Sequence, residues 1–397
     1  MFRLTFAAMA AASLTVSGCG VFFPEGGGGA GDMAVDMSKP PTPTGCPSTP
    51  NHPVAPGGYY VNGNSVCTED GRTHLFHGVD RPSLEWVSTG EQLSAADFQL
   101  MASWKANVVR IALNQDFWLP GSRFNDPAYP GLVDSAILWA KEAGMDVILD
   151  LHWSDGGVIG SCDPRGNCQH VMADLNSITF WTEVATRYKD DGRVMFELYN
   201  EPHDVAWKVW KSGGPTSDGW TAAGMQQMYD AVRATGANNL VVIGGLDWAF
   251  DLSVVKSNRI SGYNIAYATH PYGGNSSRGP STWEGAFGYL TYTDPVIATE
   301  FGDLGGTCAT DYVAQLIAYM DSHHASWTAW AWFRSGCQFP SLIEDWEEGT
   351  PSPSGTVVRN ALYRYAGMAP PPATTDGGTS PEAGTSSDAG GDGSAGN

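Results

Sequence analysis

Eight short apolar runs, spaced through the middle of the chain, constrain its fold more than any other feature. They lie at 75–79, 108–113, 147–151, 194–199, 240–244, 265–269, 296–299 and 327–332. Most are almost continuously apolar, which is typical of strands buried on both faces of a sheet. Amphipathic helical patterns lie between them at 95–105, 132–142, 178–189, 221–234, 283–290 and 312–322. Strands that alternate with helices predict a parallel sheet.

The number of repeats predicts how that sheet is arranged. Eight strand–helix units over this length are typical of a closed barrel. An open, doubly wound sheet is the alternative, but no G-x-G-x-x-G motif follows the first strand. Ahead of that strand, residues 59–75 contain an Asn62-Gly63 turn signal. We therefore predict an α/β fold, a (β/α)8 TIM barrel whose N-terminal end is closed by a short β-hairpin.

Composition divides the chain into four segments. Residues 1–18 combine Arg3 with a short apolar stretch and end in V-S-G before Cys19, which resembles a bacterial lipobox. We expect a lipoprotein-type signal peptide and lipidation of Cys19, with an ordinary cleaved signal as the alternative. Residues 19–56 are rich in Gly and Pro, and 369–397 in Gly, Ser, Thr and Asp, so they predict a tether and a disordered tail. The catalytic barrel is then expected at 57–368.

Export follows from the predicted signal peptide. The apolar stretch is too short to span a bilayer as a mature helix, so the lipid is the only expected membrane contact. We predict a cell-surface lipoprotein of the outer membrane or cell envelope, or a secreted protein.

The cysteines agree with an oxidising compartment. Without Cys19, six of the seven cysteines remain, an even number. Six cysteines allow many pairings, and sequence alone does not choose among them. The pairing we expect joins segments that the predicted barrel brings close, namely Cys46 with Cys67, Cys162 with Cys168, and Cys308 with Cys337. Zinc binding is the alternative, but the chain has neither a C-x-x-C pair nor an H-E-x-x-H helix.

Polar side chains gather where the predicted strands end. Glu201 follows the run at 194–199, and Glu300 follows the run at 296–299. The C-terminal ends of barrel strands share one mouth, so we expect the two carboxyl groups to face each other. Hydrolysis of a glycosidic bond needs two such groups, one to protonate the leaving oxygen and one to attack or to activate water. Other side chains expected at this mouth are Arg110, His152, Asn200, His270, Tyr272 and Trp332.

The order of these motifs resembles glycoside hydrolase family 5. The resemblance runs from about Tyr60 to Tyr365 and rests on N-E-P at 200–202, E-F-G at 300–302, N-V-V-R-I at 107–111, L-D-L-H-W at 149–153, A-T-H-P-Y at 268–272 and W-A-W at 330–332. It implies that Glu201 is the general acid/base and Glu300 the nucleophile of a retaining hydrolase. It also implies that the reaction uses neither a metal nor an organic cofactor.

Local chemistry suggests how the two glutamates differ. Arg110 and Tyr272 are expected to donate toward Glu300 and to keep it ionised. Glu201 has to carry a proton when substrate arrives, so we expect a raised pKa from an apolar setting and from the charge of Glu300. A retaining mechanism predicts carboxyl groups about 5 to 5.5 Å apart.

The remaining residues are expected to bind substrate. Asn200 is expected to bond the sugar 2-hydroxyl, which strengthens in the transition state. His152 and His270 are expected to orient hydroxyl groups and carboxylates, and Trp332 to offer a flat face to the sugar ring. Each has a structural alternative. Arg110 could neutralise buried Glu197 or Asp150, and His152 could be a core histidine.

Tryptophans in the predicted loops point to a polysaccharide ligand, because sugar rings stack on indole faces. We expect two to four of seven tryptophans to line a groove, and Trp153 and Trp248 are the leading candidates because they follow strands most closely. The others are Trp86, Trp118, Trp207, Trp210 and Trp283. The net charge of −21 disfavours nucleic acids and polyanions such as pectin.

Together these features predict an endo-acting β-1,4-glycoside hydrolase, expected to be a monomer. The expected partner is a neutral β-linked polysaccharide, with cellulose or a β-glucan as the expected substrate. A mannanase or xylanase of the same family is the nearest alternative. A non-catalytic surface protein that binds glycans is a more distant one.

Overall fold

The computed structural model describes residues 39–161, 168–274 and 276–371. The predicted signal peptide, Cys19, Cys162 and nearly all of the predicted C-terminal tail lie outside these residues. Among the described residues, no helix combines the length and the apolar character needed to cross a membrane.

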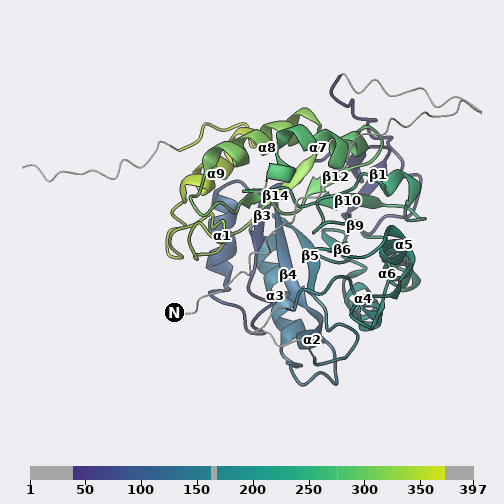
Figure 1. The fold of residues 1–397 in the computed structure, drawn as a ribbon. Helices are drawn as coiled ribbons and strands as arrows, with labels where there is room; N and C mark the ends of the chain where they lie inside the picture. Colours follow the sequence, from purple (N-terminus) through teal and green to yellow (C-terminus); the bar gives the residue numbers. More distant parts are fainter. Residues whose placement is uncertain (1–38, 162–167, 275, 372–397) are drawn as a thin grey trace, which may run out of the picture. The chain divides into compact units, whose positions relative to one another are not determined.

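Among the described residues, eight parallel strands close into a barrel in chain order (Figure 1). They are β3 His77–Arg81, β4 Val108–Asn114, β5 Asp146–Trp153, β6 Val194–Glu197, β9 Val241–Gly244, β10 Ile265–Thr269, β12 Val296–Ala298 and β14 Ser326–Ala329. The last strand pairs with the first, with Trp327 opposite His77. The predicted (β/α)8 TIM barrel is therefore confirmed.

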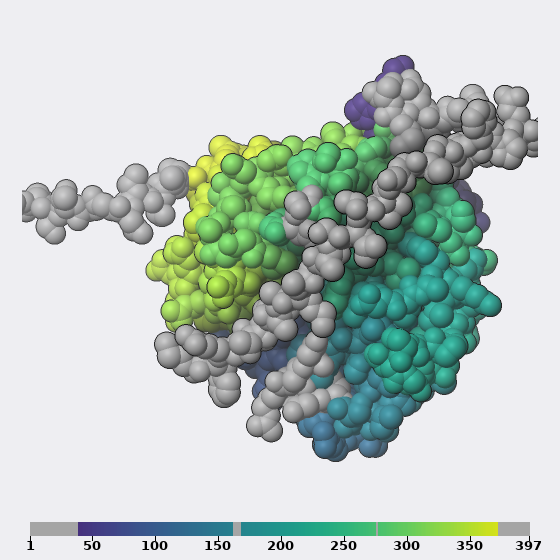
Figure 2. All heavy atoms as spheres, viewed as in Figure 1, coloured from purple at the N-terminus to yellow at the C-terminus, as the bar shows by residue number. Residues whose placement is uncertain are grey.

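Helices cover the outside of the barrel between successive strands (Figure 1). They are α1 Ala95–Ser103, α2 Gln115–Trp118, α3 Tyr129–Glu142, α4 Leu175–Tyr188, α5 Trp207–Ser212, α6 Met225–Ala234, α7 Pro280–Ala286, α8 Thr310–Ser322 and α9 Pro353–Tyr365. Short 3-10 turns lie at Val255–Ser257, Ser276–Arg278 and Gly288–Tyr292. The colours in Figure 2 change gradually around the described surface, because consecutive units lie side by side.

The start of α4 shows why helices begin where they do. The side chain of Asp174 accepts a hydrogen bond from the N–H of Asn176, and the backbone N–H of Asp174 donates one to the Ser177 hydroxyl oxygen. This capping satisfies N–H groups that have no partner inside the helix. Phe180 and Trp181 then face the barrel and are fully buried.

The structure refines several predicted boundaries. The helix predicted at 221–234 begins only at Met225, because Thr221–Ala222 form β8, which pairs with β7 at Gly214–Pro215. The helix predicted at 283–290 is divided between α7 and a 3-10 turn. Helix α9 was not among the predicted elements.

The barrel interior is apolar toward its N-terminal end. Its buried cluster contains Phe76, Val108, Ile148, Met195, Val242, Ala266, Ala268 and Ile297. Tyr59 of β1 (Tyr59–Asn62) and Val66 of β2 (Ser65–Thr68) belong to the same cluster. The predicted hairpin therefore exists and closes this end. Its turn is Gly63-Asn64, where Gly63 has φ +57°, a conformation that suits glycine.

Two of the predicted disulfides are confirmed. Cys46 pairs with Cys67, and Cys308 pairs with Cys337. The second bond joins the loop after β12 to the loop after β14. Cys168 is also disulfide-bonded, and Cys162, its predicted partner, lies outside the described residues.

Candidate active site

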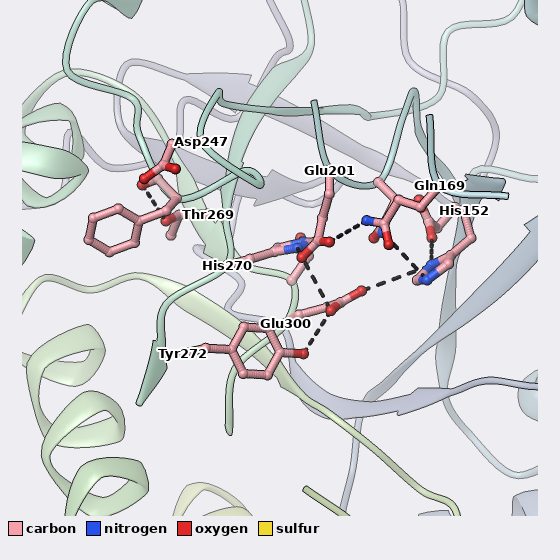
Figure 3. A network of polar contacts seen from close by, with 12 residues as sticks. His152, Gln169, Glu201, Asp247, Thr269, His270, Tyr272 and Glu300 are labelled. Carbon is pink, nitrogen blue, oxygen red and sulfur yellow. Dashed lines mark hydrogen bonds and ion pairs between the residues drawn. The ribbon is translucent and has the colours of Figure 1, made fainter. Parts of the chain in front are cut away.

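Glu201 and Glu300 meet at the C-terminal mouth of the barrel. Glu201 lies beyond the end of β6, and Glu300 lies two residues beyond β12. Figure 3 shows the two side chains pointing toward each other, with His270 beside them. One carboxylate oxygen of each glutamate and one ring nitrogen of His270 all lie within 4.8 Å of one another. The predicted juxtaposition of the two carboxyl groups is therefore confirmed.

Both carboxylate oxygens of Glu300 accept hydrogen bonds. Arg110 Nη1 donates to Oε1 at 2.7 Å, and the hydroxyl of Tyr272 donates to Oε2 at 2.7 Å. Tyr272 opens the short strand β11 (Tyr272–Gly273), which pairs with β13 (Gly302–Asp303) just after Glu300. Burial and the charge of Glu300 raise the pKa of Tyr272 well above its usual value, so its hydroxyl remains a donor.

Arg110 also binds the carboxyl groups beneath Glu300. Its Nε lies 2.6 Å from Glu197 Oε2, and its Nη2 lies 3.0 Å from Asp150 Oδ2. Its Nη1 lies 3.4 Å from Asp80 Oδ1. Both alternatives for Arg110 are thus realised at once, because it neutralises buried acids and holds Glu300. Although burial opposes its charge, these carboxylates raise the pKa of Arg110 well above its ordinary value.

The pKa values of the buried acids are shifted in opposite directions. Burial raises the pKa of Asp80 and of Asp150 well above the ordinary range, despite the nearby guanidinium of Arg110. Glu197 behaves in the opposite way. Burial disfavours its charge, but Arg110 and His270 outweigh that effect and lower its pKa to about 2.

His270 connects Glu201 to this network. Thr299 donates from its hydroxyl to Glu197 Oε1 at 2.7 Å, so its oxygen accepts from His270 Nε2 at 3.0 Å. His270 Nδ1 lies 3.0 Å from Glu201 Oε1. Burial opposes a charged imidazole, but the charges and hydrogen bonds of Glu300, Glu197 and Glu201 raise the pKa of His270 to about 10. His270 is therefore an imidazolium that donates on both sides.

The predicted rise in the pKa of Glu201 is wrong. Burial does raise it, as predicted, but hydrogen bonding to His270, the charge of His270 and a hydrogen bond from Gln169 lower the pKa of Glu201 overall. The positive charge of His270, which the prediction did not include, accounts for the difference. The His270 ring nitrogen Nδ1 lies 3.0 Å from the Glu201 carboxylate, close enough to stabilise its ionised form.

His152 and Asn200 are oriented by the same network. Asn200 Oδ1 accepts from Arg110 Nη2 at 2.7 Å, and its Nδ2 lies 3.4 Å from His152 Nε2. His152 Nδ1 lies 2.7 Å from Asp150 Oδ2. Burial lowers the pKa of His152, so the ring donates through Nδ1 and accepts through Nε2. The donor and acceptor atoms of both side chains are therefore fixed by their neighbours.

The expectation for Trp332 is wrong. Its ring is fully buried, its Nε1 donates to Asp97 Oδ1 at 2.7 Å, and it packs edge-on against Trp104. Trp330 lies at the site instead, stacked on His152 with ring centroids 5.5 Å apart. Strand β14 ends at Ala329, so strand alternation does not extend to the W-A-W segment and gives no guide to which ring faces the site.

Four of the seven predicted loop tryptophans keep an exposed part. Trp153 ends β5, and Trp248 stacks on His203 with ring centroids 3.6 Å apart. The N–H of Trp248 donates to the carbonyl oxygen of Pro202, which places this ring beside the Glu201 segment. Trp86 and Trp207 are also partly exposed. The other three, Trp118, Trp210 and Trp283, are core residues.

Glu201, His270 and Glu300 are spaced closely enough to present three ligands to a cation. Their hydrogen bonds favour another function, because all four carboxylate oxygens already face N–H or O–H donors. These donors are His270 and Gln169 on Glu201, and Arg110 and Tyr272 on Glu300. Among the residues that the sequence motifs did not mark, Gln169 and Thr299 contact the site directly. Neither belongs to a recognisable motif, so no sequence signal identified them.

The sequence of this chain is similar to those of known proteins. The family model described as Cellulase (glycosyl hydrolase family 5) matches residues 62–336. Endoglucanase MaCel5A of Microbulbifer sp. (strain ALW1) is 24% identical over 77% of this chain and 58% of its own length. Endoglucanase E-5 of Thermobifida fusca is 25% identical over 77% of this chain and 64% of its own length. The chain thus spans less than two thirds of these relatives.

A solved structure agrees with the family match. The β-glucanase SdGluc5_26A of Saccharophagus degradans, in complex with cellotetraose, has a TM-score of 0.63 and 25% identity. The similarity covers 83% of this chain and 99% of that one. Because the family model matches well over half of the sequence, the chain belongs to glycosyl hydrolase family 5.

Proposed function

We propose that this protein is a retaining, endo-acting β-1,4-glycoside hydrolase of a neutral polysaccharide, with Glu201 as acid/base and Glu300 as nucleophile. The spacing of the two carboxylates carries the proposal. Retaining enzymes hold their carboxyl groups about 5 to 5.5 Å apart, whereas inverting enzymes leave about 6.5 to 9.5 Å for a water. Oxygens of Glu201 and Glu300 within 4.8 Å of each other favour the retaining arrangement.

The reaction has two steps. Glu300 attacks the anomeric carbon, the bond from that carbon to the glycosidic oxygen breaks, and Glu201 gives its proton to the departing oxygen. In the second step, Glu201 takes a proton from water, and the water oxygen attacks the same carbon and releases Glu300. His270 supports both steps, because its Nδ1 lies within hydrogen-bonding distance of Glu201 Oε1, at 3.0 Å.

The surrounding groups act on the sugar rather than on the bond that breaks. Asn200, held by Arg110, is placed to bond the 2-hydroxyl, a contact that strengthens as charge develops in the transition state. Trp330, stacked on His152, offers an aromatic face at the mouth. Arg110 and Tyr272 hold Glu300 in one orientation, which limits the reorganisation needed for attack.

Cellulose or a related β-glucan is the proposed substrate. Two relatives are named endoglucanases, and the solved β-glucanase contains cellotetraose. The net charge of −21 adds a repulsion against polyanionic glycans. Mannan and xylan remain the nearest alternatives, since the backbone preference depends on loops around the mouth. Release of reducing sugar from a panel of purified polysaccharides distinguishes among them.

We also propose that the protein is exported, anchored by a lipid at Cys19, and monomeric. The Cys46–Cys67 and Cys308–Cys337 disulfides support an oxidising compartment. A Cys19→Ala variant is expected to leave the membrane fraction, and light scattering is expected to give the mass of one chain.

Azide rescue tests the catalytic assignment. In Glu300→Gly, azide is expected to enter from the face that Glu300 vacates and to yield an α-glycosyl azide. A β-glycosyl azide would show that Glu201 and Glu300 have exchanged roles. Tight binding of an oligosaccharide by the native protein without any hydrolysis, measured by calorimetry and product analysis, would support the non-catalytic alternative instead.

A further inference from the structure

Glu201 is held by a residue that the mechanism does not use. Its Oε1 faces His270, and its Oε2 accepts a hydrogen bond from the side-chain amide of Gln169 (Figure 3). Gln169 lies between β5 and α4 and is partly buried. Both oxygens of the acid are therefore occupied before any substrate is present.

Hydrogen bonds hold the backbone around Gln169 on the same side of the mouth as Glu201. Tyr199 donates from its hydroxyl to the carbonyl oxygen of His170 at 2.7 Å. The N–H of His203 donates to the carbonyl oxygen of Val171 at 2.9 Å. Cys168 is buried and disulfide-bonded. Because Tyr199 and His203 flank Glu201 in sequence, these bonds place the Gln169 amide beside the Glu201 carboxylate.

The chemistry of an amide explains what this contact does. An amide N–H is a donor only, so it stabilises an ionised carboxylate oxygen and opposes a proton on that oxygen. Because Oε1 is committed to His270, Oε2 is the oxygen left to face a glycosidic oxygen. The amide of Gln169 presents an N–H donor to Oε2. A glycosidic oxygen offers only lone pairs, so Oε2 must carry a proton in order to bond it.

We propose that Gln169 caps the acid in the resting enzyme and that the glycosidic oxygen of the substrate replaces its amide on Glu201 Oε2. Gln169 is then a positioning residue that couples substrate binding to protonation of Glu201. Loss of the amide donor on binding favours the protonated acid at the moment when a proton is needed. Before binding, the ionised form predominates.

Direct titration of Glu201 tests the cap and, although the proposal rests on the proposed function, needs no substrate. The Glu201 signal is followed by NMR in protein labelled at the glutamate carboxyl carbons and is assigned by its loss in Glu201→Gln. Gln169→Leu keeps most of the side-chain bulk and removes the donor. We expect the midpoint of the Glu201 titration to rise by about one pH unit. An unchanged midpoint overturns the proposal.

Gln169→Glu provides a second variant in case the first does not fold. A carboxylate at this position replaces a donor with a like charge, so the expected rise in the Glu201 midpoint is larger than in Gln169→Leu. A midpoint equal to that of the native protein in this variant also overturns the proposal.

His170→Ala is the matched control. His170 is the next residue, and its ring lies edge-on to Trp220 with centroids 6.0 Å apart. Its removal perturbs the same segment without deleting a donor to Glu201. We expect the Glu201 midpoint to stay at the native value. A shift as large as that of Gln169→Leu would mean that packing of the segment, and not the cap, sets the titration.

Kinetics with a 4-nitrophenyl cello-oligosaccharide complete the test. If the cap has to be displaced, Gln169→Leu raises kcat/KM. A fall in kcat/KM caused by a higher KM would identify Gln169 as an ordinary substrate contact and overturn the proposal. If no variant hydrolyses any glycan, the proposed function fails while the titration still decides whether Gln169 controls the protonation of Glu201.

Discussion

The two ends of the barrel use the same strands but opposite kinds of side chain. Near the N-terminal end, the interior residues of β4, β5 and β6 are Val108, Ile148 and Met195. Two positions further along each strand, and therefore on the same side, lie Arg110, Asp150 and Glu197. Two residues, about 7 Å of strand, separate an apolar core from a cluster of ionisable groups.

This contrast shows how one scaffold separates stability from chemistry. The apolar end is closed by the hairpin and gains free energy from burial. The charged end buries ionisable groups, which costs free energy unless each is paired. Arg110 compensates for this burial by contacting several acids at once. The charged end therefore depends on two cations, Arg110 and His270, whereas the apolar end depends on many interchangeable contacts.

The largest expected effect is at the charged end. Glu300→Gln should lower kcat at least about a thousandfold, because an amide cannot serve as the nucleophile. Arg110 and Tyr272 still have an oxygen and an amide to contact, so the thermal midpoint should change little. Hydrolysis of a soluble β-glucan and a melting curve measure the two quantities. Glu347→Gln, at an exposed position, is the control, and equal activity in both variants would contradict the assignment.

Exchanging one residue at each end compares their contributions to stability. Arg110→Met removes the cation that lies closest to Glu197 and Glu300 and should cost about 3 to 5 kcal/mol of unfolding free energy. Val108→Ala only opens a small cavity and should cost about 2 kcal/mol. Denaturant unfolding measures both, and kcat of folded Val108→Ala should be native. Equal losses of stability would show that the charged end is not held by Arg110.

The two tryptophans of the W-A-W segment sharpen the contrast within the charged end. Trp332→Ala removes a buried ring and its bond to Asp97, and should cost about 3 to 5 kcal/mol of stability. Trp330→Ala should mainly raise KM and lower kcat, because its ring faces the site beside His152. Unfolding curves and initial rates separate the effects. The opposite pattern would restore Trp332 as the ring that faces the sugar.

A slope in the pH dependence of stability is expected from His270. The pKa of His270 is raised to about 10 from an ordinary value of 6.5. Its contribution to stability is therefore complete below about pH 6.5 and is lost as the pH rises toward 10. His270→Asn should flatten this alkaline decline in the thermal midpoint. An equal decline in the variant and the native protein would mean that His270 is not charged in the folded state.

Sequence patterns predicted the barrel because its strands repeat a simple physical signal. Continuous apolar runs and intervening amphipathic segments give the eight strands and six of the helices. The two acids were also predictable, since Glu201 and Glu300 follow strands whose ends share one mouth. These features depend on periodicity and on position along a strand, and both can be read from the amino-acid sequence.

What the sequence did not predict depends on contacts between distant segments. The lowered pKa of Glu201 arises from His270, 69 positions away. The burial of Trp332 depends on Asp97 and Trp104, which lie on another unit. Gln169 reaches the acid from a loop without any motif. Such contacts are set by three-dimensional packing, and no local pattern records them.

The pairing of Trp327 with His77 also has a consequence for biosynthesis. Strand β14 is the last to leave the ribosome, yet it completes hydrogen bonding for the first strand of the barrel. Until it arrives, a nascent chain carries two unsatisfied sheet edges, which are sites of aggregation. Chains cut short before residue 326 are therefore expected to be substrates for quality control and not smaller enzymes.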